Sequence, residues 1–237
     1  ALVERTRPAV VVHAAALSAM ADCARDPVLA RAVNVEGTRN LSRAASARGA
    51  RFVHVSTDLV FDGESAPYGE DAETSPMSVY GATKRDSERA ALEVSRAIVV
   101  RVSLLFGPTR TARRGFFDVQ LDATKRGAPL ALFADEWRTP LSLRAAAEGL
   151  LQVAASDQTG ILHLGGPERM SRYEMGVRLA RIAGCSARSI ARASRTSIPG
   201  GEPRPRDVSL DSSKLRRAFP ELARRSFEDE CAGMLEG

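Results

Sequence analysis

Aromatic residues are scarce in this sequence, since phenylalanine, tryptophan and tyrosine together make up 5% of its 237 residues. Proteins that bind nucleic acids by stacking usually interleave aromatic side chains with a basic stripe. The net charge is +5, but the arginines that carry most of it are scattered along the chain. We therefore expect no nucleic acid partner. The charge indicates an arginine-rich surface, with a mild attraction for anionic substrates as the functional alternative.

Cysteine, histidine and long apolar runs are also scarce. The cysteines and histidines stand far apart, without the spacing of a disulfide framework or a zinc site; they are Cys23, Cys185, Cys231, His13, His54 and His163. No apolar stretch approaches the roughly 18–20 residues that span a bilayer. These absences predict a protein without a metal and without a membrane partner, and the reducing cytoplasm is the expected location.

A glycine-rich turn is missing as well. Parallel sheets that bind dinucleotides open with a strand followed by G-x-G-x-x-G or a variant of it. The only glycine pair directly after an apparent strand is Gly165-Gly166, which lacks this spacing and is expected to be an ordinary loop. The opening letters, ALVERTRP, resemble the end of a helix. We therefore expect either a fragment that starts downstream of such a turn or a protein that binds no dinucleotide through it.

What the chain does contain is an alternation of strands and helices. Continuous apolar runs at 9–16, 51–57 and 97–106 predict buried strands, and apolar residues at helical spacing predict helices at 27–48 and about 79–95. Strands that alternate with helices predict a parallel sheet with right-handed crossovers. The fold class is therefore α/β. After residue 107 the pattern loosens into further elements: helices at 115–127, 142–156 and 171–184, strands at 129–133 and 160–166, an irregular loop at 197–207 and two short helices in the tail.

The stretch SVYGATK contains the strongest chemical signal, Tyr80-x-x-x-Lys84. The two side chains project from one helix face, and an ammonium group near a phenol lowers a pKa that starts near 10. Such a tyrosine can exchange a proton with a carbonyl or hydroxyl group. The spacing alone is more typical of a surface pair. The setting favours the catalytic alternative, because Ser56, Thr57 and Asp58 stand where a strand ends, at the edge that borders the ligand crevice in open α/β sheets.

Several segments together resemble a known family. The strings STDLVFDG, SPMSVYGATK, VVRVSLLFGP, AVNVEGTRNL and RPRDVSLDSSKL resemble the extended short-chain dehydrogenase/reductase superfamily, and most closely the dTDP-4-dehydrorhamnose reductase and sugar-nucleotide-binding family. The resemblance covers essentially the whole chain. Members of this family begin with a strand, a glycine-rich turn and two further strands, so the resemblance implies an N-terminally truncated Rossmann-like parallel sheet.

The resemblance also implies a division into domains. Residues 1–106 and about 139–164 would form a partial dinucleotide-binding domain. Residues from about 107 to 138 and from 165 to 237 would form a smaller α/β substrate-binding region.

The resemblance assigns roles to individual residues. Tyr80 would be the proton donor, Lys84 would tune it and hold the nicotinamide ribose, and Thr57 would supply a hydroxyl to the carbonyl. Asn34 would brace the active site from a neighbouring helix. The cofactor, NADP or NAD, would lie against Ala14, Ala15, Ser56, Tyr80, Lys84, Ser103 and Leu105. The substrate would contact Asp58, Leu104 and Arg204.

Some positions depart from the family's pattern or allow a simpler explanation. The asparagine that precedes the two alanines in the family is His13 here, and a tryptophan that lines the sugar pocket is Leu104. Asp58 has the alternative of only capping a turn, and Arg204 of being solvated rather than holding phosphate. The implied activity is the NAD(P)H-dependent reduction of a 4-keto nucleotide sugar by a cytoplasmic enzyme, with a homodimer as the expected assembly. The alternatives are a non-catalytic subunit resembling the β subunit of methionine adenosyltransferase and an inactive fragment.

Overall fold

The centre of the protein is a four-stranded parallel sheet. The computed structural model describes residues 2–109, 114–197 and 202–235. The strands lie in the order β1–β2–β3–β8, and their bounds are Val10–His13, Arg51–Thr57, Ala97–Val102 and Gly160–Leu164. All three neighbouring pairs are parallel, as the alternation of strands and helices predicts.

The first strand is shorter than its apolar run. The prediction placed a strand over 9–16, but β1 pairs with β2 only as far as His13, opposite His54. Four residues later, the backbone N–H and C=O groups of Leu17 bond to the side chain of Asn34. The apolar run therefore ends as sheet at His13, because the backbone beyond it finds its partners on a helix.

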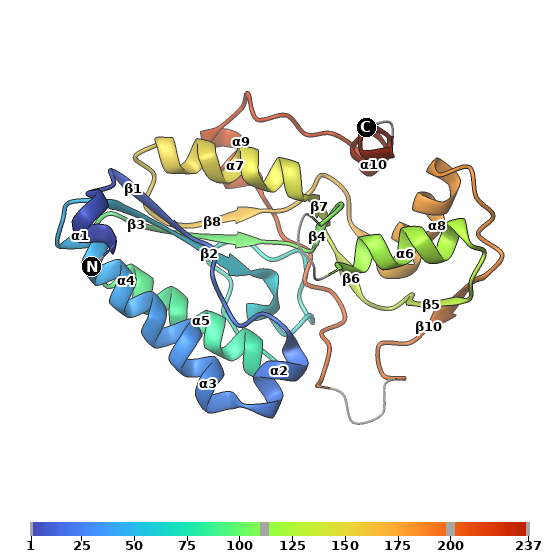
Figure 1. The fold of residues 1–237 in the computed structure, drawn as a ribbon, viewed down its shortest axis with the longest axis horizontal. Coiled ribbons are helices and arrows are strands. Elements are labelled where there is room, and N and C mark those ends of the chain that lie inside the picture. Colours follow the sequence, from blue (N-terminus) through green and yellow to red (C-terminus); the bar gives the residue numbers. More distant parts are fainter. Residues whose placement is uncertain (1, 110–113, 198–201, 236–237) are drawn as a thin grey trace.

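Helices cover both faces of the sheet (Figure 1). One face carries α3 (Pro27–Arg31), the π-turn η1 (Ala32–Glu36), α4 (Gly37–Ser46) and α5 (Val79–Leu92). The first three of these run on from one another and correspond to the helix predicted over 27–48. The other face carries α7 (Leu143–Ala155) and α9 (Ser213–Ala218). Alternate strand residues supply the two cores: Phe52 and Val99 face α4 and α5, whereas Val53 and Ile98 belong to the core with α7 and α9.

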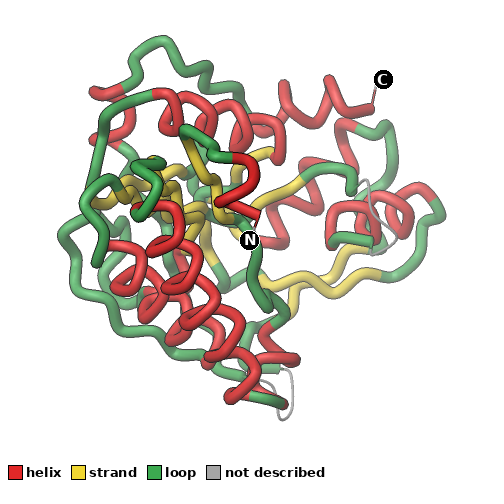
Figure 2. The backbone as a smooth tube through the Cα atoms, turned by 60° about the vertical axis from the view of Figure 1, so that its left-hand side comes forward, coloured by secondary structure: helices red, strands yellow, loops and turns green. Residues whose placement is uncertain are grey.

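A smaller group of elements lies beside the carboxyl ends of the strands. It contains α6 (Phe116–Lys125), β5 (Leu130–Phe133), α8 (Arg172–Ile182), β10 (Ile190–Ala193) and α10 (Phe227–Leu235). Strands β5 and β10 form a separate parallel pair, which Figure 2 shows apart from the main sheet. The sequence analysis missed β10, because its four residues, IARA, contain no apolar run. It also missed α2 (Met20–Arg25), which starts without a side-chain cap, and the short α1 (Leu2–Thr6) is the helix end expected from the opening residues.

Two small ladders connect this group to the sheet. Strand β4 (Leu105–Phe106) pairs with β7 (Leu141–Ser142), and β6 (Trp137–Arg138) pairs with β9 (Met170–Ser171). The strand predicted over 97–106 is therefore two strands, interrupted at Ser103 and Leu104. The interruption places the side chains of residues 103–105 at the junction between the sheet and the smaller group.

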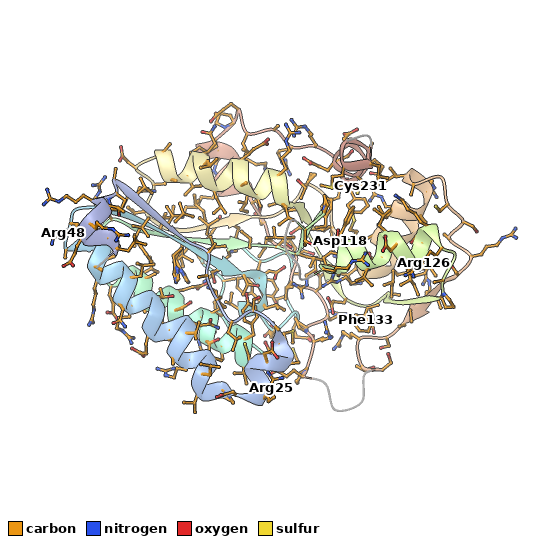
Figure 3. All side chains as sticks on the ribbon, in the orientation of Figure 1. Arg25, Arg48, Asp118, Arg126, Phe133 and Cys231 are labelled. Carbon is orange, nitrogen blue, oxygen red and sulfur yellow. The ribbon has the colours of Figure 1, made fainter. Side chains whose placement is uncertain are left out.

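Exposed arginines lie on separate elements. Arg25, Arg48 and Arg126 point outward from the ends of α2, α4 and α6 (Figure 3). Among the described residues no helix is long and apolar enough to cross a membrane.

The start of α5 packs directly on the backbone of a neighbouring turn. After β2 the chain forms the 3₁₀ turn η2 (Asp58–Val60), and Ser78 caps α5 by accepting a hydrogen bond from Gly81 N. A Cβ atom added at Gly81 would lie 2.3 Å from the carbonyl oxygen of Leu59 and 2.9 Å from Cβ of Pro76. Only a glycine allows the helix to approach η2 this closely.

This contact predicts opposite effects for two helical glycines. Gly81→Ala should lower the free energy of unfolding by about 1–3 kcal/mol, because the added methyl group overpacks a backbone contact. Gly37→Ala should raise it by about 0.5–1 kcal/mol, because Gly37 is helical and its nearest obstacle lies 3.8 Å away. Urea denaturation of the two variants measures both changes. An unchanged or higher stability of Gly81→Ala would show that the contact is not a constraint.

Candidate active site

The residues singled out from the sequence gather at the carboxyl edge of the sheet. Segments that directly follow β1, β2 and β3 contain Ala14 and Ala15, Asp58, and the stretch 103–105. Parallel strands end at one edge, so these segments lie on the same side of the molecule. Helix α5 adds Tyr80 and Lys84 from its first two turns, and η1 adds Asn34.

Tyr80 is half-buried, and Thr57 and Asp58 are among the groups that act on the pKa of its phenol. Burial and the nearby charge of Asp58 raise the pKa of Tyr80 to about 12, against smaller lowering effects of the Thr57 hydrogen bond and the charge of Arg138. The prediction that Lys84 lowers this pKa is therefore wrong for the structure. Tyr80 is a protonated phenol over the whole neutral range, which suits a proton donor.

Lys84 turns its ammonium group toward β2. Its Nζ donates to the carbonyl of Val55 at 2.8 Å and lies 3.2 Å from Nε2 of His54, with the side chain 2% exposed. Burial lowers the pKa of Lys84 to about 8, and the charge of Glu88 opposes this shift. Burial and the charge of Lys84 also lower the pKa values of His13 and His54. Both histidines are therefore neutral at pH 7, and the lysine is the cation of this cluster.

Asn34 joins three segments. Its side chain accepts a hydrogen bond from Leu17 N at 2.8 Å and donates to Leu17 O and to Thr83 Oγ1, each at 3.0 Å. The π-turn that contains Asn34 adds a residue to one helical turn, a distortion often found at functional sites. Asn34 thus ties the segment after β1 to α5, as the bracing role requires.

Four other residues that were predicted to contact cofactor or substrate form hydrogen bonds or packing contacts inside the protein. Ser56 donates its hydroxyl to the buried carboxylate of Glu88, which forms an ion pair with Arg101. Ser103 donates to Asp58 Oδ2 at 2.9 Å. Leu104 packs against the core of the smaller region, and Leu105 pairs with Leu141 in the β4–β7 ladder.

A chain of buried charges leads from the site into the smaller region. Asp58 is 1% exposed and accepts a hydrogen bond at 2.8 Å from Arg138. Arg138 lies 3.6 Å from the fully buried Glu136, which also contacts Arg172 at 3.3 Å and Arg204 at 3.2 Å. Arg204 is therefore an ion-paired residue at the junction rather than a freely solvated one.

Sequence reasoning missed Arg138 and Glu136. Both stand in DEWRTP, where an acidic and a basic residue two positions apart look like an ordinary surface pair. Their burial depends on segments far away in the sequence, namely η2, α8 and the region around Arg204. One signal in the sequence was that three charged residues stand within four positions, shortly before a predicted core helix.

The residues present fit one half of a nicotinamide dinucleotide. Ala14 and Ala15 are small and exposed directly after β1, so they leave open surface at the edge where Lys84 and Tyr80 lie. The 237 residues contain no G-x-G-x-x-G or G-x-x-G-x-x-G sequence, which is the turn that holds a pyrophosphate. The fit is therefore to the nicotinamide and its ribose. Within the described parts of the chain, no cluster of His, Cys, Asp or Glu residues could hold a metal ion.

Comparisons with known proteins show which proteins this chain is similar to. The RmlD substrate binding domain family matches residues 1–236. The chain is 34% identical over 223 residues to dTDP-4-dehydrorhamnose reductase of Streptomyces griseus, covering 90% of this chain and 71% of that protein. It is 32% identical over 225 residues to the β subunit of methionine adenosyltransferase 2 of Xenopus tropicalis, covering 92% of this chain and 67% of that protein.

The fold is also that of a solved reductase structure. The crystal structure of dTDP-4-dehydrorhamnose reductase from Bacillus anthracis in complex with NADP superposes with a TM-score of 0.91 and 22% sequence identity. It covers 99% of this chain, and this chain covers 83% of that structure. The Rossmann-like α/β fold expected from the sequence is therefore confirmed.

The buried ammonium group of Lys84 predicts a gain in stability when it is removed. Its pKa is about 8 in the folded protein against an ordinary value of 10.5, so the unfolded chain binds more protons between these values and stability rises with pH across that window. Lys84→Met should therefore raise the free energy of unfolding at pH 7 by up to about 3 kcal/mol. This gain should shrink toward pH 10.

Urea denaturation at pH 7 and pH 10 checks this expectation. Lys125→Met is the matched control, because Lys125 is exposed at the end of α6 and its removal should change little at either pH. A loss of stability in Lys84→Met at pH 7 would mean that the ammonium group stabilises the fold.

Proposed function

The chain belongs to the RmlD substrate binding domain family, and we propose that it performs the NAD(P)H-dependent reduction of a 4-keto nucleotide sugar, as dTDP-4-dehydrorhamnose reductases do. The observation that carries the proposal is the placement of Tyr80 beside Thr57 and Asp58 at the carboxyl end of β2, where both residues act on the pKa of its phenol. It brings two hydroxyl groups to the point where a ligand meets the sheet. One of them is a protonated phenol, which is a competent acid for a forming alkoxide.

The proposed chemistry divides the work between cofactor and protein. A bound nicotinamide cofactor would supply the hydride to the keto carbon. Thr57 would donate its hydroxyl to the substrate's carbonyl oxygen, and Tyr80 would pass its proton to that oxygen as the C=O π electrons collect there. Lys84, one helical turn from Tyr80, would hold the nicotinamide ribose with its ammonium group.

The arginines at the junction support a nucleotide diphosphate as the anchor of the substrate. Arg138, Arg172 and Arg204 surround Glu136, and Asp58 is the second carboxylate of this group. The three cations outnumber the two anions, which leaves a positive charge beside the crevice. Guanidinium groups suit diphosphate oxygens because their fork geometry allows paired hydrogen bonds. Arg204, which is partly exposed, is the proposed phosphate contact.

A second candidate is a non-catalytic dinucleotide-binding subunit. The similarity to the β subunit of methionine adenosyltransferase 2 favours it, because that relative covers 92% of this chain. Leu104, which lies in the interruption between β3 and β4, also favours it over a typical sugar pocket. Such a subunit would use Lys84 for cofactor binding and would have no turnover. A cytoplasmic location and a homodimer complete the proposal, and the first of these rests on the scattered free cysteines.

Removal of the phenol hydroxyl tests the proposed role of Tyr80. Tyr80→Phe should lower kcat by about 10²- to 10⁴-fold with little change in cofactor affinity, because the ring and its packing remain. Thr57→Val should cost less, since it removes one neutral hydrogen bond to the carbonyl. NADPH oxidation with a dTDP-4-keto-6-deoxy sugar measures turnover, and cofactor titration measures affinity.

Tyr173→Phe is the control, because Tyr173 lies on α8 with Arg192 stacked over its ring. Turnover of Tyr80→Phe close to that of this control would remove Tyr80 from the chemistry. An absence of turnover in the unmodified protein, together with weaker dinucleotide binding in Lys84→Met, would favour the non-catalytic subunit.

A further inference from the structure

We infer that Arg138 is a positioning residue of this site, which acts through Asp58 to set the charge and the hydrogen bonding that Tyr80 and Thr57 meet. The role depends on the proposed function of Tyr80 as the proton donor. The electrostatic effect itself exists whether or not the protein turns over a substrate.

The position of Arg138 is fixed by the backbone of the junction. It is the second residue of β6, paired with Met170 of β9, and the preceding residue, Trp137, donates its N–H to Arg206 O at 2.8 Å. The Arg138 side chain is 6% exposed, and one of its terminal nitrogens lies 2.8 Å from Asp58 Oδ1. A guanidinium group from the smaller region therefore reaches the end of β2.

Asp58 is the principal counter-ion of Arg138. The other neighbouring carboxylate, Glu136, lies farther away at 3.6 Å and has two closer cations, Arg172 at 3.3 Å and Arg204 at 3.2 Å. The charge of Glu136 is thus divided among three guanidinium groups. Charge-assisted hydrogen bonds of about 2.8 Å are the strong ones. The contact with Asp58 is therefore the strongest ion pair that Arg138 makes.

Arg138 and Thr57 compete for the same oxygen atom of Asp58. Thr57 donates its hydroxyl to Asp58 Oδ1 at 3.2 Å, and Arg138 donates to the same atom at 2.8 Å. Ser103 holds the other oxygen, Oδ2, at 2.9 Å. Because Oδ1 already accepts the shorter hydrogen bond from Arg138, the hydrogen bond from the Thr57 hydroxyl to Asp58 is weak. Thr57 is then free to turn its hydroxyl to a substrate carbonyl, while its oxygen accepts from Leu59 N at 3.2 Å.

The Asp58–Arg138 pair also limits the electrostatic effect of Asp58 on the Tyr80 phenol. Asp58 raises the pKa of Tyr80 and Arg138 lowers it, while burial and the thiol of Cys23 act in the same direction as Asp58. Without Arg138, an unbalanced and buried carboxylate would face Tyr80. The phenol would then hold its proton more tightly and be a poorer acid toward the alkoxide.

Titration of Tyr80 tests the inference without requiring turnover. Protein labelled with 3-fluorotyrosine, whose lower intrinsic pKa brings the titration into an accessible range, gives ¹⁹F NMR signals from three tyrosines. The Tyr80 signal is the one that is lost in Tyr80→Phe. Arg138→Met should raise the pKa of Tyr80 by about one unit, because the charge of Asp58 then acts on the phenol without its counter-ion. Asp58→Asn should shift it in the opposite direction.

Three further variants separate positioning from folding. Arg138→Lys keeps the charge and should leave the titration near its original value. Asp58→Asn/Arg138→Met removes both charges, so it should fold better than Arg138→Met and return the titration to or below its original value. Arg101→Met breaks another buried pair, with Glu88, and should not move the Tyr80 signal.

Kinetics add a second measurement where turnover is present. In Arg138→Met, kcat should fall more than KM rises, because the effect acts through Tyr80 and Thr57. An unchanged Tyr80 titration in both Arg138→Met and Asp58→Asn would overturn the inference and leave Arg138 a purely structural residue. An absence of turnover in the unmodified protein would contradict the proposed function alone, since the ¹⁹F titrations would still decide the role of Arg138.

Discussion

The close contact between the first turn of α5 and the backbone of η2 is the constraint on which the site depends. Gly81 brings the helix so near that a Cβ atom would lie 2.3 Å from the carbonyl of Leu59. The residue before it is Tyr80, and the turn that it approaches begins at Asp58, directly after Thr57. One steric fact therefore sets how near the phenol of Tyr80 lies to the hydroxyl of Thr57.

The electrostatics of the site follow from this proximity. Bringing α5 against η2 also brings Tyr80 near Asp58, and burial removes the water that would screen the carboxylate. Arg138 balances that charge from a different part of the chain, through a side chain that is 6% exposed. Buried ion pairs of this kind contribute little net stability, because desolvation offsets much of their attraction. The Asp58–Arg138 pair is better explained by what it does to neighbouring hydroxyl groups than by what it adds to folding.

Lys84 illustrates a similar trade between stability and function. The ammonium group lies in a setting of backbone carbonyl and neutral imidazole, and its pKa falls to about 8 because burial disfavours the charge. No ion pair to Lys84 is present among the described residues, and Glu88, whose charge raises the pKa of Lys84, is already paired with Arg101. A protein optimised for folding alone would place an apolar side chain here. The charge fits the proposed role toward the ribose.

The sequence by itself determined the parallel sheet, the helices on its faces and the gathering of Thr57, Tyr80 and Lys84, because apolar periodicity and the ends of parallel strands are local properties. Asn34 and Arg204 were found through resemblance. Only the tertiary structure decided which way Lys84 points, why the pKa of Tyr80 rises rather than falls, and that Arg138 and Glu136 belong to the site. The burial of a side chain and the charges around it depend on segments that are distant in the sequence. Helical spacing carries no information about them. That is why DEWRTP by itself does not indicate the buried pair that Arg138 forms with Asp58.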